Sequence, residues 1–296
     1  FFMFTSTLII IAGTLFVMWL GERITEKGIG NGISLIIMTG IIARLPFALR
    51  DEFLSRLNDQ GGGLVIFLIE MVALFAVVVS VILLVQGTRK IPVQFAKKIV
   101  GNKQYGGVRQ YIPLKVNAAG VMPIVFAQAI MFIPAYVAQF FPESASWQGF
   151  AANITDYTSP LYNIVFATLI ILFTYFYTAI AVNPSQMADD MKKNGGFIPG
   201  VKPGRKTSEF IDDVMSKITL PGSIFLALVA ILPSFAKMAS VNTNFAQFYG
   251  GTSLLILVGV VLDTLQQIES HLLMRHYDGL MKSGRIKGRA SAGVTA

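Results

Sequence analysis

The most regular feature of the chain is a series of long apolar runs separated by polar connections. A helix that crosses a lipid bilayer needs about 20 consecutive, mostly apolar residues. The second run is the weakest, because Gly30, Gly32 and Gly40 interrupt it, and a re-entrant segment is an alternative there. The pattern predicts seven membrane-spanning helices, at residues 1–20, 29–45, 64–85, 116–141, 161–182, 220–238 and 254–274.

Composition supports the same class and removes several others. Hydrophobic residues make up 54% of the 296 positions and charged residues 14%, whereas an ordinary soluble domain carries about 25% charged residues. The chain has no cysteine and two histidines, which excludes a disulfide scaffold, a thiolate nucleophile and a cysteine-ligated zinc site. No hydrolytic triad or phosphate-binding loop is recognisable. We predict an all-α, polytopic transmembrane helix bundle that is not an enzyme and has no metal or cofactor.

The basic residues are distributed unevenly between the connections. Cytoplasmic loops of membrane proteins carry an excess of lysine and arginine. Of the 24 basic residues, twenty fall in connections on one side of the predicted spans, and the other four, Arg44, Arg50, Arg56 and Lys237, fall on the opposite side. This predicts an external loop at 46–63 and four cytoplasmic segments, at 21–28, 86–115, 183–219 and 275–296, the last being the tail.

The connection 86–115 is basic throughout and contains no acidic residue. Gly101, Gly106 and Gly107 predict a flexible tip. Such a segment suits the phosphates of ribosomal RNA through salt-dependent contacts, an acidic protein surface, or anionic lipid. Alternatively, the charges only set the sidedness of the membrane spans. The cations are Arg89, Lys90, Lys97, Lys98, Lys103, Arg109 and Lys115.

The connection 183–219 combines tight turns with an amphipathic segment. Glycine–proline turns around 199–204 present Lys202 and Arg205, which indicates a contact surface, although a plain connector has the same composition. Apolar residues between 210 and 218 recur on one helical face, so we predict a short amphipathic helix that leads into the sixth span.

Two of the predicted spans carry polar features. In the last span, a polar stripe and Glu269 lie on the cytoplasmic side of a purely apolar half, which favours either a cavity filled with water from the cytoplasm or hydrogen bonds between helices. The stripe is Asp263, Gln266, Gln267 and Ser270. In the third span, Glu70 lies near the outer end and is expected to reach the interface.

The fourth span contains two prolines, Pro123 and Pro134, with Gln128 between them. A proline removes a helical hydrogen bond, and its ring crowds the preceding turn. We therefore expect this span to be kinked or to move.

Three segments indicate a particular family in addition to the class of the protein: GERITEKGIGNGIS at 21–34, IPLKVNAAGVMPIVFA at 112–127 and GGFIPGVKPG at 195–204. They closely resemble the SecY family, the pore subunits of the bacterial Sec protein translocon. Members have ten spans in two inverted halves, so the resemblance implies that this chain begins inside a longer protein and holds spans four to ten. Residues 1–45 would then be the last two spans of the N-terminal half, and 64–296 the C-terminal half with five spans.

The resemblance also implies roles for particular residues. The family closes its pore with a ring of aliphatic side chains, and the matching positions are Ile33, Ile37, Val125 and Ile256, with valine at 125 where isoleucine is usual. The helix with the two prolines forms one side of a lateral gate for signal segments. The matching gate residues are Pro123, Gln128, Ile133 and Pro134.

The partners implied are the membrane subunits SecE and SecG, the SecA motor ATPase, the ribosome, signal peptides, the translocating polypeptide and lipid. The location implied is the bacterial plasma membrane. SecA and the ribosome would contact the basic residues of 86–115 and the turn formed by Lys202, Pro203, Gly204 and Arg205. Lys202 matches a position that is usually arginine; lysine keeps the charge but loses the planar fork of donors.

Two other classes fit the hydropathy pattern. A secondary transporter would use Asp263 and Glu269 as ion or proton sites. A seven-span receptor or retinal protein is disfavoured, because the last span has no lysine for a Schiff base.

Overall fold

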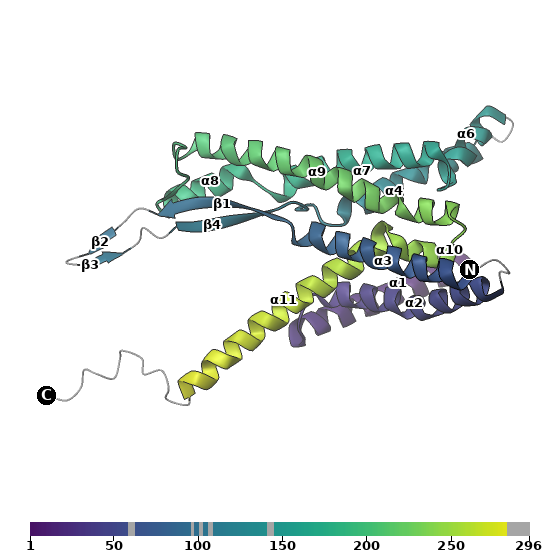
Figure 1. Ribbon diagram of the computed structural model, residues 1–296, viewed down its shortest axis with the longest axis horizontal. Coiled ribbons are helices and arrows are strands. Elements are labelled where there is room, and N and C mark those ends of the chain that lie inside the picture. The colour runs from purple at the N-terminus through teal and green to yellow at the C-terminus, as the bar shows by residue number, and fades with distance from the viewer. Residues whose placement is uncertain (59–62, 96–97, 101–102, 106–108, 141–144, 283–296) are drawn as a thin grey trace. The chain divides into compact units, whose positions relative to one another are not determined.

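The computed structural model describes residues 1–58, 63–95, 98–100, 103–105, 109–140 and 145–282. The chain divides into two compact units, Phe1–Ala43 with Ile256–Ala296, and Arg44–Leu255. Helices make up most of both units (Figure 1). The elements are α1 (Phe2–Lys27), α2 (Gly32–Asn58), α3 (Gly63–Gln86), β1 (Thr88–Phe95), β2 (Lys98–Val100), β3 (Lys103–Tyr105), β4 (Arg109–Lys115), α4 (Met122–Met131), α5 (Ile133–Gln139), α6 (Ala145–Thr155), α7 (Pro160–Ala181), α8 (Pro184–Lys193), β5 (Gly196–Phe197), α9 (Arg205–Met238), α10 (Thr243–Ala246), η1 (Gln247–Tyr249) and α11 (Gly251–Lys282).

Six of the seven predicted spans are single helices within the described residues. They are α1, α2, α3, α7, α9 and α11, each long and apolar enough to cross a membrane. Residues 32–45 of the glycine-interrupted run belong to one of them, α2. The class predicted from hydropathy is therefore confirmed, although the number of single-helix spans is one lower.

The fourth predicted span is the exception, because it is broken near its second proline. Helix α4 ends at Met131 and α5 begins at Ile133, with Pro134 in the first turn of α5. Proline has no backbone N–H to donate and is tolerated in a first turn. The predicted kink is thus present as a break between two shorter helices.

The predicted external loop at 46–63 is helical up to Asn58, and its place outside the membrane stays a prediction. Helix α2 continues to Asn58 and contains Pro46. Residues 59–62 lie outside the described part of the chain. The polar residues of 50–58 suggested a loop, but they form the C-terminal end of α2. Two of the charged side chains there, Glu52 and Arg56, are buried.

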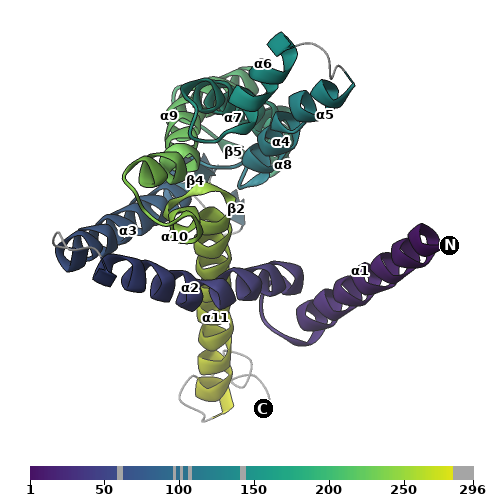
Figure 2. The ribbon, with the colours of Figure 1, turned by 90° about the vertical axis from the view of Figure 1, so that its right-hand side faces the viewer.

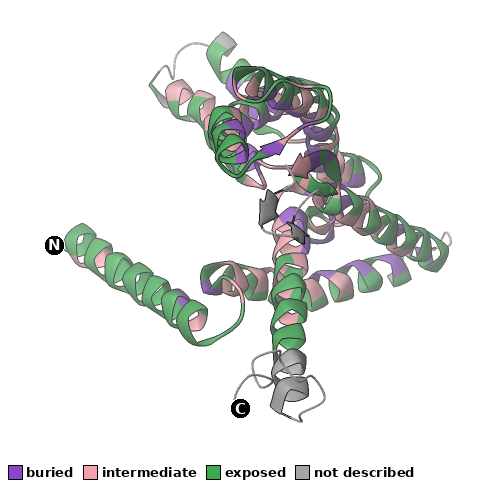
Figure 3. Cartoon of the chain, turned by 90° about the vertical axis from the view of Figure 1, so that its left-hand side faces the viewer, coloured by how far each residue is buried: buried purple, intermediate pink, exposed green. Residues whose placement is uncertain are grey.

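In the first unit, α1 and the start of α2 are joined by a close approach of two glycines. A Cβ atom on Gly32 would overlap the carbonyl oxygen of Gly21. The backbone N–H of Gly32 donates to Thr25 Oγ1 at 2.8 Å, and Asn31 Oδ1 accepts from the N–H groups of Ile33 and Ser34. The glycines of 28–32 therefore permit a tight, hydrogen-bonded turn. Beyond this turn, most of α1 is exposed (Figure 3).

In the second unit, α7 packs between α4 and α9. Figures 1 and 2 both show α7 beside α9. The buried residues of α7 recur at every fourth position, at Phe166, Ile170, Thr174 and Thr178. This spacing forms one ridge along the helix, which is how helix surfaces interlock.

Candidate functional site

The two long polar connections of the second unit meet in one small sheet. Strand β1 pairs antiparallel with β4 over seven residue pairs, from Thr88↔Lys115 to Gln94↔Arg109. Strand β1 also pairs with β5, at Gln94↔Phe197 and Phe95↔Gly196. Segments about 100 residues apart therefore share backbone hydrogen bonds. We call β1, β4 and β5 the basic sheet.

An apolar cluster holds the basic sheet against the neighbouring helices. Ile91 and Val93 alternate with exposed residues along β1, as a strand with one buried face requires. They pack with residues of β4, of α8 and of the start of α9. The buried members of the cluster are Ile91, Val93, Leu114, Met191, Ile198, Ile211 and Met215.

This packing leaves the basic side chains of the sheet free for contact. Arg89, Lys90 and Arg109 are exposed. Lys97, Gly101, Gly106 and Gly107 lie outside the described residues. Lys98 and Lys103 belong to the β2–β3 pair, in the register Lys98↔Tyr105 and Val100↔Lys103, and their side chains are not described.

A rigid turn presents the second group of predicted contact residues, Lys202–Arg205, which we call the basic turn. Gly204 has φ 97° and ψ −134°, a conformation that favours glycine. The buried Thr207 donates through Oγ1 to the carbonyl oxygen of Lys202 at 3.0 Å, and through its backbone N–H to Gly204 O at 2.9 Å. Lys202 and Pro203 are exposed, and Arg205 Nε lies 3.2 Å from Glu209 Oε1.

The predicted pore residues lie on three helices. Ile33 and Ile37, one helical turn apart on α2, are 47% and 46% exposed. Ile256 is half-buried on α11, and Val125, on α4, is 44% exposed. Val125 belongs to the second unit and the isoleucines to the first, so their convergence on one axis stays a prediction.

The predicted gate residues flank the break between α4 and α5. Pro123 is buried in the first turn of α4, whereas Gln128 and Ile133 are exposed. Pro134 occupies the first turn of α5. The break thus separates Pro123 and Gln128 from Ile133 and Pro134.

A buried charge cluster, formed by Glu52, Arg56 and Glu70, was not expected from the sequence. Arg56 Nε donates to Glu52 Oε1 at 2.8 Å, and one of its terminal nitrogens contacts Glu70 Oε1. The three residues are 1%, 7% and 6% exposed. Glu70 is therefore buried in the protein rather than at the interface between membrane and water. The spacing of Glu52 and Arg56 by four positions was the available signal.

The buried charge cluster is tied to the chain that follows α9. Glu52 Oε2 accepts from the backbone N–H of Asn242 at 2.8 Å, and Arg56 donates to Ser240 O at 2.9 Å. Tyr249 donates from its hydroxyl to the carbonyl oxygen of Glu70 at 2.7 Å. Burial raises the pKa of the Tyr249 phenol above its ordinary value, which keeps this donor protonated.

In the first unit, the polar stripe of α11 shares one cavity of about 350 Å³ with Gly28 and Ile29. The lining includes Asp263, Gln266, Gln267, Ser270 and His271, but not Glu269. In the part of the chain that the structure describes, no group of three or more His, Asp or Glu side chains could hold a metal ion.

Comparison with known proteins gives one consistent match. A family model described as SecY matches residues 1–265. The protein translocase subunit SecY of Chlamydia trachomatis is 45% identical over 293 residues, which cover 97% of this chain and 64% of that protein. The corresponding subunit of Halalkalibacterium halodurans is 48% identical over 280 residues, which cover 93% and 65%. The chain thus spans a little under two thirds of the length of these curated relatives.

Solved structures agree at the level of the fold. One describes the plug domain of a SecY protein as stabilising the closed state of a translocation channel; it has a TM-score of 0.56 at 19% identity and covers 87% of this chain and 64% of that chain. Another, described as a protein conducting channel, has a TM-score of 0.56 at 18% identity and covers 87% and 63%.

The relatives are translocase subunits, so the alternative of a secondary transporter that uses Asp263 and Glu269 has no support. The apolar helices and these matches identify a multi-pass membrane protein. Because the family model matches most of the chain, the chain belongs to the SecY family.

Proposed function

We propose that this chain is part of the central pore-forming subunit of a protein-conducting channel. The channel would translocate secretory proteins across the bacterial plasma membrane and release membrane segments laterally into lipid. The observation that carries the proposal is the family match over residues 1–265, together with a fold similar to that of solved channels.

The proposed pore ring is formed by Ile33, Ile37, Val125 and Ile256. A narrow apolar constriction loses its water and blocks ions. Aliphatic walls also offer no fixed hydrogen bonds, so they can deform around any passing chain. All four side chains keep exposed surface, which a pore lining requires.

The proposed lateral gate is the broken segment α4–α5, with Pro123, Gln128, Ile133 and Pro134. An interrupted helix can change its angle at the break without losing further hydrogen bonds. A hydrophobic signal segment would pass this element on its way to lipid.

The proposed docking surface joins the basic sheet and the basic turn on the cytoplasmic side. The β1–β5 pairing supports a single surface, because it connects the two segments through backbone hydrogen bonds. SecA would meet Lys202 and Arg205, and the ribosome would meet the cations of the connection 86–115, including Lys97, Lys98 and Lys103. SecE and SecG are the proposed membrane partners.

Crosslinking to a polypeptide in transit tests the proposal. These 296 residues contain no cysteine, so Ile256→Cys provides a single thiol once any cysteine elsewhere in the complete subunit is replaced. A secretory protein with one cysteine, arrested in transit, should form a disulfide with this position. The matched control is Ile164→Cys on α7, because Ile164 is 66% exposed and is not one of the proposed pore residues. Equal crosslinking at both positions, or none at Ile256→Cys, would contradict a pore at Ile256.

A further inference from the structure

The buried charge cluster of Glu52, Arg56 and Glu70 contains more acidic groups than basic ones. It has two carboxyl groups and one guanidinium, and each of the three side chains is 8% exposed or less. If both carboxyl groups were ionised, the cluster would carry one net negative charge in the protein interior. Burying a charge without a counter-charge is strongly unfavourable. The charge count therefore favours one neutral carboxyl group.

The described residues around the cluster offer no second cation. Glu70 is the only charged residue of α3, and residues 239–250 contain none. Lys237, at the end of α9, lies over the ring of Tyr157, 4.3 Å from its centroid. Tyr249 faces the cluster as a neutral group, because its hydroxyl donates to the backbone carbonyl of Glu70. The other charged residues of α2 are exposed: Arg44, Arg50 and Asp51.

The hydrogen bonds indicate which carboxyl group is neutral. Both oxygens of Glu52 accept from donors, Oε1 from Arg56 Nε and Oε2 from the backbone N–H of Asn242. In Glu70, Oε1 accepts from Arg56, whereas Oε2 is buried and receives no donor. The two carboxyl groups also lie within hydrogen-bonding reach of each other. An ionised carboxyl group can only accept hydrogen bonds, so a bond between the two needs a proton, and the unoccupied oxygen of Glu70 has room for it.

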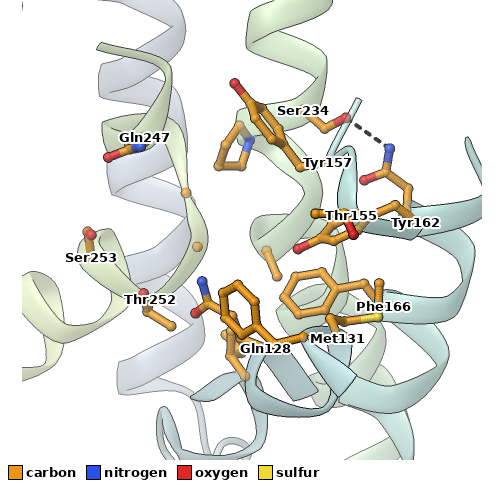
Figure 4. A pocket seen from close by; sticks show the side chains of 17 residues that line it. Gln128, Met131, Thr155, Tyr157, Tyr162, Phe166, Ser234, Gln247, Thr252 and Ser253 are labelled. Carbon is orange, nitrogen blue, oxygen red and sulfur yellow. Dashed lines mark hydrogen bonds between the residues drawn. The ribbon is translucent and has the colours of Figure 1, made fainter. Parts of the chain in front are cut away.

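Water from the neighbouring cavity does not provide the missing partner. The cavity of about 400 Å³ shown in Figure 4 belongs to the same unit, but Glu70 is not among its lining residues. Tyr249 and Val241 instead belong to a buried apolar cluster, and Val241 lies between the two residues whose backbone bonds Arg56 and Glu52. A neutral acid costs less than an ion in such surroundings.

We propose that the buried charge cluster is a proton-binding site, in which Glu70 holds one proton and shares it with Glu52 in a hydrogen bond. The cluster is then neutral overall, with one acid and one ion pair. Release of the proton leaves two carboxylates beside one guanidinium. The excess charge weakens the connection that the cluster makes between α2, α3 and the chain after α9.

The substitution Glu70→Gln in the complete subunit distinguishes the two protonation states. Glutamine has the shape of the neutral acid and supplies an N–H where the acid supplies its O–H. With a neutral Glu70, the folding equilibrium constant in detergent micelles at neutral pH should stay the same or rise. With an ionised Glu70, the substitution would break a buried ion pair and lower the constant by more than about a hundredfold. That loss would overturn the proposal.

The pH dependence of folding counts the proton. An unfolded glutamate is ionised above about pH 5, whereas the folded chain keeps the proton, so stability falls as the pH rises. Relative to Glu70→Gln, the folding constant of the unsubstituted subunit should fall about tenfold for each pH unit until the proton is released. Glu26→Gln, in an exposed pair with Arg23, is the control and should keep the unsubstituted dependence. Parallel curves for the unsubstituted subunit and Glu70→Gln would contradict a bound proton.

Infrared spectroscopy of the reconstituted subunit detects the proton directly. A protonated carboxyl group has a carbonyl stretch that shifts in D₂O. This band should disappear in Glu70→Gln and also in Glu52→Gln, because either change leaves one carboxyl group for one guanidinium. Glu26→Gln should retain the band. Spectra in which neither substitution in the cluster removes a band would overturn the proposal.

Discussion

At the scale of single residues, Arg56 shows how a charge is kept inside the helix bundle. Its guanidinium contacts two buried carboxylates and the carbonyl of Ser240. Removing one partner of a buried ion pair destabilises a protein strongly, because the remaining charge has no compensation. Arg56 therefore holds the end of α2, the start of α3 and the chain after α9 together.

We expect Arg56→Leu to lower the free energy of unfolding by about 3–5 kcal/mol, measured by denaturant unfolding in detergent micelles. The control is Lys217→Leu, which breaks an exposed pair with Asp213 and should change stability by less than about 1 kcal/mol. Adding Glu52→Gln and Glu70→Gln to Arg56→Leu should restore part of the stability. An effect of Arg56→Leu no larger than the control would contradict the role of buried charge.

The backbone of Gly204 gives a second prediction at this scale. At φ 97°, a side chain is strained, and Gly204→Ala should cost about 1 kcal/mol or more. Because this glycine shapes the basic turn, the substitution should also weaken binding of SecA, measured by co-sedimentation with membrane vesicles. Gly149→Ala is the control, since Gly149 lies in α6 with open space around its Cβ position. Equal effects at both glycines would argue against a strained turn.

At the scale of elements, hydropathy identified the spans but not the sheet. Membrane helices are recognised from long apolar runs, a strong signal, and α1, α3 and α11 follow it directly. The strands β1 and β4 are short and rich in charge, and their hydrophobic face is visible only as the alternation at Ile91 and Val93. The glycines and cations of that segment are its more visible features, which is why its sequence predicts a basic connection with a flexible tip.

Candidate residues also fall into two groups, those that a local sequence motif identifies and those that depend on contacts between distant parts of the chain. Those carried by a local motif lie close together: the basic turn precedes α9, and the stripe from Asp263 lines one cavity, while its role stays a prediction. The buried charge cluster depends on contacts between residues up to about 190 positions apart. No local pattern encodes such contacts, so the sequence places Glu70 at an interface instead of in the interior.

The prediction at this scale concerns the break between α4 and α5. Pro134→Ala restores a backbone N–H and removes the ring that crowds the previous turn. We expect the two helices to join, so that spin labels at Gln128 and Tyr136 report one narrow distance distribution in electron paramagnetic resonance. Pro160→Ala is the control, because Pro160 begins α7, where a proline is well tolerated. An unchanged distance in Pro134→Ala would mean that packing, not the proline, breaks the helix.

At the scale of the whole molecule, the basic sheet brings together charges that are separated in the sequence. Its proposed binding to the ribosome should therefore depend on the salt concentration. Replacing Arg89, Lys90 and Arg109 by glutamine should weaken ribosome binding and reduce the dependence of log K on log salt by up to about 0.9 for each phosphate that is no longer neutralised. Vesicle co-sedimentation at several salt concentrations measures this slope. Lys193→Gln, an exposed cation at the end of α8, should leave it nearly unchanged. A weaker affinity with the original slope would point to a protein surface rather than phosphate as the partner.

The largest-scale prediction concerns the barrier to ions. If the ring at Ile33, Ile37, Val125 and Ile256 excludes water by being apolar, then polar side chains should let water and ions through. We expect asparagine at Ile33, Ile37 and Ile256 in the complete subunit to raise single-channel conductance in planar bilayers and to relax the requirement for a functional signal sequence. Ile164→Asn, on the exposed face of α7, places the same polar group outside the ring and should leave conductance at its original level. Since each side chain contributes to one constriction, the leak should grow with the number of substitutions. An unchanged conductance in the triple variant would show that something other than these side chains holds the membrane barrier.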